Sequence, residues 1–186
     1  MDVVIADGPA LDSSLLRAEN SGVHLTVEVT QTVDKRKLET DCDKIGRAKA
    51  LPKAPGWTCS RTVGFLFAFS ADSALETLAR NFIGWCAEND PARWPSGVFV
   101  WDLGFIVWTR PGTREMVYCP DLGLDVMVVP QDRDVLLPFF AYVHGSVAHH
   151  RGQSTDFIDA IGRASFGGVG DTTVVLPGPR RITAAS

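Results

Sequence analysis

Residues 23–51 carry the pattern that most constrains the fold, because an apolar–polar alternation passes within a few residues into a helical repeat. An alternation with a period of two predicts a strand that has one apolar face and one polar face. The apolar positions are Val23, Leu25, Val27 and Val29, and the polar positions are His24, Thr26, Glu28 and Thr30. We expect a half-buried strand whose polar face is open for function.

A helix is predicted to follow over residues 34–50. Its apolar residues recur at the spacing of one helix face, and either Thr32 or Asp34 is suited to the N-cap position. This apolar stripe consists of Leu38, Cys42, Ile45 and Ala48. Because Pro52 disfavours helical backbone at the residue before it, the helix is expected to end by Leu51.

Strands and helices are predicted to alternate along the rest of the chain. The further strands are 2–6, 62–69, 98–101, 105–109, 115–119 and 124–129, and the further helices are 70–89 and 134–149, with a short helix at 155–163. Ser73 and Glu76 suit a capping box in the second helix. The interleaving predicts an α/β fold with a mixed β-sheet flanked by helices. We expect a single domain over residues 1–151 and a weakly structured C-terminal tail over residues 152–186.

Composition and charge narrow the class of protein. Apolar residues make up 45% of the chain and charged residues 22%, the balance of an ordinary globular protein. The formal net charge of -4 excludes a global positive field that would attract nucleic acid or anionic lipid. The four cysteines form no C-x-x-C pair, which argues against a zinc ribbon. The apolar stretches of the chain are too short to span a bilayer, and its first residues do not resemble a signal peptide. We therefore expect a cytoplasmic protein without membrane contact.

Two acidic residues, Asp2 and Glu28, could carry chemistry if their strands are neighbours. Glu28 and Thr30 are two apart on one strand, so their side chains leave the same face of the sheet. Asp2 would join Glu28 there if the strand over residues 2–6 lies alongside. Two convergent carboxylates are hard oxygen ligands suited to Mg²⁺ or Mn²⁺, which could activate water for attack on a phosphodiester. The other interpretation is an amphipathic strand with an ordinary polar surface.

These residues resemble the core of the PD-(D/E)xK nucleases. The resemblance rests on Asp2-Val3-Val4-Ile5, a loop, Val27-Glu28-Val29-Thr30, and a helix that opens with Asp34-Lys35-Arg36-Lys37-Leu38-Glu39. More narrowly, the segments resemble an uncharacterised bacterial branch of that fold, over roughly the first third of the chain. The resemblance implies a restriction-endonuclease-like sheet, a metal ion held by Asp2 and Glu28, and a hydrolase that cleaves phosphodiester bonds.

The sequence departs from this family in two respects. Thr30 stands where the family has the lysine of its E-x-K triplet, and threonine supplies no positive charge. The family's upstream helix also has no counterpart before Asp2. Lys35, Arg36 and Lys37 lie in the first turn of the next helix, where cations oppose the helix dipole. Lys37 or Lys35 could therefore replace the missing lysine, and the three could contact DNA or RNA.

Two functional hypotheses follow from these observations. The first is a metal-dependent nuclease with Asp2, Glu28, Thr30 and Lys37 as its site residues. The second is a non-catalytic binding or scaffolding module built on the same fold. Thr30 and the acidic net charge favour the module, and the paired carboxylates with the basic helix start favour the enzyme.

Overall fold

A computed structural model describes residues 2–6, 11–12, 17–18, 22–53, 62–131, 135–154 and 172–180. The strands are β1 (Asp2–Ala6), β2 (Leu11–Asp12), β3 (Arg17–Ala18), β4 (Val23–Val33), β5 (Val63–Ala71), β6 (Gly97–Val100), β7 (Gly104–Thr109), β8 (Met116–Val117), β9 (Asp125–Pro130) and β10 (Val174–Pro177). The helices are α1 (Lys35–Lys49), α2 (Leu75–Ala87), the 3-10 turn η3 (Pro91–Arg93) and α3 (Leu136–His150). Eight strands form one mixed sheet in the order β1-β4-β5-β6-β7-β9-β10, with β8 beside β7, while β2 and β3 pair separately.

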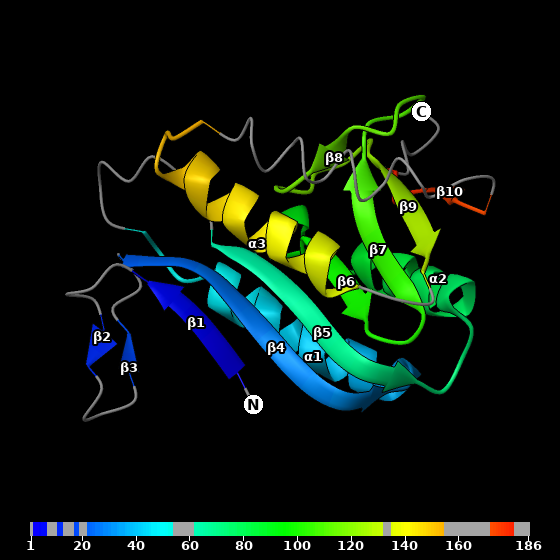
Figure 1. Cartoon of the computed structure of the whole chain (residues 1–186), viewed down its shortest axis with the longest axis horizontal. Coiled ribbons are helices and arrows are strands. Elements are labelled where there is room, and N and C mark those ends of the chain that lie inside the picture. The colour runs from blue at the N-terminus through cyan, green and yellow to red at the C-terminus, as the bar shows by residue number, and fades with distance from the viewer. Residues whose placement is uncertain are drawn as a thin grey trace, which may run out of the picture.

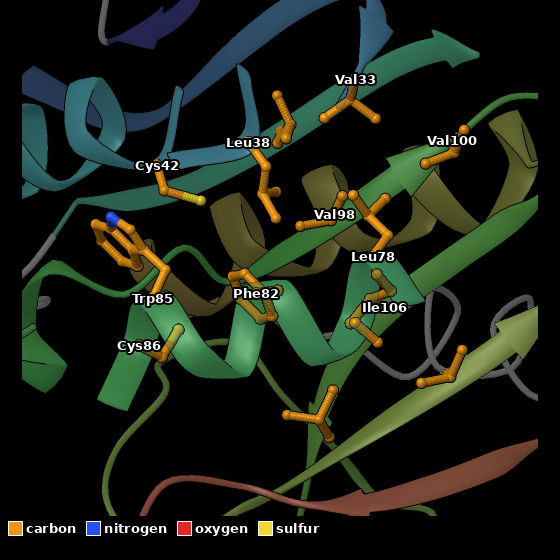
Figure 2. Packing of buried hydrophobic residues seen from close by; sticks show 14 of the residues in the cluster. Val33, Leu38, Cys42, Leu78, Phe82, Trp85, Cys86, Val98, Val100 and Ile106 are labelled. Atoms are coloured by element: carbon orange, nitrogen blue, oxygen red, sulfur yellow. The ribbon is translucent and has the colours of Figure 1, made fainter. Parts of the chain in front are cut away.

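Helices cover both faces of this sheet, which confirms the predicted α/β class (Figure 1). On one face, Leu38 of α1 and Phe82 of α2 join an apolar cluster with Ile106 of β7. Figure 2 shows these side chains meeting between the two helices and the strands. Helix α3 covers the other face, where the rings of Tyr142 and Phe65 pack in a T-shaped arrangement. None of the helices in the described ranges is long and apolar enough to cross a lipid bilayer.

Strand β4 pairs with β1 in antiparallel fashion on one side and with β5 in parallel fashion on the other. In this register Asp2 lies opposite Glu28 on one side, and Leu66 lies opposite Glu28 on the other. The prediction that the polar face of β4 is open is wrong, because His24, Glu28 and Thr30 are all buried. Helix α1 lies across β4 and β5 on this side and closes the face from solvent.

The ends of the elements differ in part from the predictions. Of the two predicted candidates, Thr32 and Asp34, the N-cap of α1 is Asp34, whose side chain accepts a hydrogen bond from the Lys37 backbone amide at 2.6 Å. The predicted capping box is wrong, because α2 begins after Ala74 without a side-chain cap. Strand β10 lies within the range predicted as a weakly structured tail, where an apolar segment pairs with β9. The predicted helix at 155–163 lies outside the described residues.

Gly64 sets how closely α1 approaches β5. A Cβ atom at this position would overlap the Ile45 side chain of α1 and lie 3.3 Å from Lys49 Cδ. Because protein interiors are close-packed, the helix could accept that atom only by moving away from the sheet. Because position 64 has no side chain, α1 can lie directly on the face of the sheet that contains Glu28.

We predict that Gly64→Ala lowers the free energy of unfolding by about 1–3 kcal/mol, the usual cost of overpacking a core. Urea unfolding of the two proteins measures this difference. Gly84→Ala is the matched control, because a Cβ there meets nothing within 4 Å. Alanine inside helix α2 should stabilise the protein by up to about 1 kcal/mol. Equal effects of the two substitutions would contradict the close approach at Gly64.

Candidate functional site

Glu28 forms an ion pair with Lys44, which neither the strand pattern nor the helix start predicted. Glu28 is only 6% exposed, at the middle of β4 and beneath α1. The Lys44 side chain descends from α1, and its Nζ donates a hydrogen bond to Glu28 Oε1. A buried carboxylate is stable only with such a partner, because burial removes the water that would otherwise solvate it. The pair therefore connects α1 to the polar face of β4.

A second carboxylate, Asp41, lies on α1 beside the same lysine. Its side chain is fully buried, and its Oδ1 accepts a hydrogen bond from Lys37 Nζ at 2.5 Å. The Lys44 ammonium lies 3.4 Å from the same oxygen. Residues three and four apart on a helix share one side, so Lys37, Asp41 and Lys44 form a row that faces β4. The two lysines and the carboxylates Glu28 and Asp41 sum to zero charge.

The surroundings hold Lys44 in its charged form. The hydrogen bond to Glu28 is the largest influence and raises the pKa of Lys44 above its ordinary value of 10.5. Partial desolvation opposes this rise, and the negative charges of Glu28 and Asp41 add to it. A lysine with a raised pKa is an ammonium ion at neutral pH. Lys44 therefore supplies a fixed positive charge and is not a proton acceptor.

A small pocket opens beside this ion pair. Its volume is about 180 Å³, and it lies between β1, β4 and α1. The lining residues are Val4, Thr26, Val27, Glu28, Lys44, Ile45 and Ala48. The Thr26 hydroxyl is buried, and no described residue forms a hydrogen bond with it. The pocket thus brings together a carboxylate, an ammonium and a hydroxyl on largely apolar walls.

Of the residues that the sequence singled out, Asp2 and Thr30 lie beside Glu28 in the sheet, and Lys35 and Lys37 lie on α1. Asp2 lies opposite Glu28 in the backbone register, so the two strands are neighbours as the metal hypothesis requires. Thr30 is buried two residues beyond Glu28. Lys37 contacts Asp41, whereas Lys35 is exposed and lies 3.9 Å from Glu39. Of the lysines in α1, the one that meets Glu28 is thus Lys44 and not a member of the first turn.

Sequence reasoning missed both Lys44 and Asp41. Asp41 lies on the buried side of α1, beside the apolar residues Leu38 and Cys42. A carboxylate next to an apolar stripe is unusual and was therefore a detectable sign of a specific partner. Lys44 follows Lys37 by seven residues, or two helical turns, but its contact depends on how α1 is rotated against the sheet.

The described side chains do not complete a metal site. Glu28 and Asp41 are the carboxylates described at this site, and each already accepts a hydrogen bond from a lysine ammonium group. Within the described ranges, no three His, Cys, Asp or Glu side chains are grouped closely enough to hold a metal ion. A cation at Glu28 would therefore need a ligand beyond this set, and the position opposite in the register is Asp2.

No known protein-family model matches this chain, and no curated protein matches its sequence. Among solved structures, it is similar to NucC of P. aeruginosa ATCC27853 in its cAAA-bound form, with a TM-score of 0.44 and 12% identity. That match covers 67% of this chain and 52% of the NucC chain. NucC of E. coli MS115-1, also cAAA-bound, matches with a TM-score of 0.39 and 13% identity over 55% of this chain and 48% of its own. The chain thus spans about half the length of these NucC chains.

We predict that Lys44→Met lowers the free energy of unfolding by about 1–3 kcal/mol, because buried Glu28 loses the hydrogen bond and the charge of Lys44. The cost stays below that of breaking a fully buried pair, since the Lys44 side chain is 39% exposed. In a double-mutant cycle with Glu28→Gln, the combined loss should be smaller than the sum of the two single losses. Arg80→Met breaks the exposed Arg80–Glu76 pair and should cost under about 0.5 kcal/mol. Strictly additive losses at Lys44 and Glu28 would contradict the pairing.

Proposed function

We propose that the protein hydrolyses phosphodiester bonds of nucleic acids at the pocket beside Glu28 and Lys44. The observation that supports this proposal most is the approach of Lys44 to Glu28 from α1. The nuclease resemblance requires a positive charge next to this carboxylate, and Thr30 cannot supply one. Lys44 provides that charge from the helix instead of from the strand.

Each side chain of the pocket has a task in such a reaction. Attack on a phosphodiester builds negative charge on the phosphoryl oxygens, and an ammonium already fixed in the pocket stabilises this charge without reorganisation. Glu28 would orient the attacking water through its carboxylate oxygens. The Thr26 hydroxyl is placed to hydrogen-bond a substrate oxygen at the pocket wall. The proposed Mg²⁺ or Mn²⁺ ion, held by Asp2 and Glu28, would lower the pKa of a bound water.

The start of α1 is the part proposed to contact the nucleic acid. Lys35 and Arg36 are exposed there. They lie at the N-terminal end of the same helix that contains Lys44. The net charge of -4 gives no general attraction to a polyanion, so a local cluster must supply it. Binding through these residues should weaken as the salt concentration rises.

A second candidate function is a binding module without catalysis. The zero net charge of the site favours a binding module, because Lys37 and Lys44 already neutralise Asp41 and Glu28. Such a set is stable without any cation. In this case the ion pair would fix α1 to the sheet, and the exposed start of α1 would remain a contact surface.

We predict that the purified protein cleaves DNA or RNA in the presence of Mg²⁺ or Mn²⁺. Glu28→Gln and Asp2→Ala should abolish cleavage, and Lys44→Met should reduce kcat about 10²–10³-fold, the effect of losing one group that stabilises transition-state charge. Gel assays on double-stranded DNA, single-stranded DNA and RNA measure the rates. Arg110→Met, which breaks the exposed Arg110–Glu115 pair after β7 and away from α1, is the control and should cleave at the parental rate.

The same assay separates the two candidate functions. Cleavage by the parent that both Glu28→Gln and Lys44→Met retain would rule out this pocket as the active site. An inactive parent would favour the binding module. Activity gained only in Thr30→Lys would then identify a site that has lost its catalytic lysine.

A further inference from the structure

We propose that Asp41 is a positioning residue for Lys44, which keeps the ammonium at the pocket when Glu28 is engaged by water, cation or substrate. The inference rests on the proposed function and assigns a task to a residue that this function does not use directly.

The burial of Asp41 has no explanation in the packing of α1 alone. Its side chain is fully buried, next to the apolar stripe that contains Leu38 and Cys42. An aliphatic side chain would suit this position better, because burying a carboxylate costs far more than burying a methyl group. An ion pair that only supported the helix would lie on its exposed side, as Glu76 and Arg80 do on α2.

Lys44 is shared between two carboxylates of different kinds. Glu28 belongs to the sheet and lines the pocket, whereas Asp41 belongs to the same helix as Lys44, three residues before it. Since Asp41 and Lys44 are fixed on one helix, their separation changes little when something else enters the pocket. Without Asp41, a Lys44 side chain displaced from Glu28 would turn outward, because it is already 39% exposed.

Asp41 also has the capacity to take over the ammonium. Its Oδ1 contacts both Lys37 and Lys44, and its Oδ2 is buried and accepts no hydrogen bond from the described residues. A carboxylate can accept several hydrogen bonds through its two oxygens. Lys37 balances the charge of Asp41, so Asp41 does not depend on Lys44 for its neutralisation when Lys44 serves the pocket. The unused oxygen is the acceptor that Lys44 can gain as it leaves Glu28.

Two substitutions at position 41 separate positioning from support of the fold. Asp41→Asn keeps the shape of the side chain and removes its charge, and Asp41→Leu fits the apolar stripe and should fold even if the amide does not. The first measurement is the side-chain ammonium signal of Lys44 in ¹⁵N NMR of the full chain, identified by its absence from Lys44→Met. We expect a visible signal in the parent, in Lys37→Met and in Glu28→Gln, where the charge of Glu28 no longer holds the ammonium, and its loss through fast proton exchange when either Asp41 substitution is combined with Glu28→Gln.

The second measurement is hydrolysis of the substrate that the parent cleaves. Both Asp41 variants should lower kcat about 10- to 100-fold with little change in KM, the cost of misplacing a catalytic group by about 1 Å. In the Lys44→Met background the same substitutions should have no further effect. A residue that only supports the fold would lower the rate equally in both backgrounds, and that outcome overturns the proposal.

The two measurements fail independently. Retention of the Lys44 signal when the Asp41 substitutions are combined with Glu28→Gln overturns the positioning role whatever the activity. A parent that cleaves nothing overturns the proposed function, and the NMR comparison alone then decides whether Asp41 holds Lys44. Loss of the signal when Asp41→Leu is combined with Glu28→Gln, with no loss of thermal stability relative to Glu28→Gln, gives the strongest support, because the fold then does not need the carboxylate.

Discussion

Helix α1 rests on β5 only because position 64 has no side chain, and the rest of the site depends on this contact. The Ile45 side chain occupies the space that any Cβ at Gly64 would need. This close approach brings one side of α1 over the polar face of β4. The groups on that side of the helix then have to match the groups on the strand, in charge as well as in shape.

The helix and the strand match because their charged side chains form ion pairs, and not because charged side chains are absent from the contact. Covering β4 with a helix removes Glu28 from water, which is tolerable only if the helix carries a cation at the right turn. Lys44 lies at that turn, and Asp41 with Lys37 continues the row along α1. Such a polar network favours one rotation of the helix about its axis, because another rotation would separate Lys44 from Glu28 and Asp41 from the groups it contacts.

The local elements could be predicted from the sequence, because period and cap are properties of neighbouring residues. The alternation over residues 23–30 and the cap at Asp34 are examples, and both are present. The contact between Lys44 and Glu28 joins residues on different elements and depends on helix rotation, which no local pattern contains. Strand β10 was not predicted for a related reason. It pairs with β9, and Val128, the residue opposite Val174, lies more than forty residues earlier in the chain. Asp41 was within reach, because a carboxylate beside an apolar stripe is visible in the sequence itself.

Strand β1 has a consequence for how a ligand could reach the pocket. Within the described sheet it is a border strand, bonded to β4 alone, and Val4 on it forms part of the pocket wall. A strand bonded along one side detaches at a smaller free-energy cost than one bonded along both, because fewer hydrogen bonds and less apolar surface are lost. Of the walls of the pocket, the one formed by β1 is therefore expected to detach at the lowest free-energy cost, whereas α1 is held to the sheet by its ion pair with Glu28.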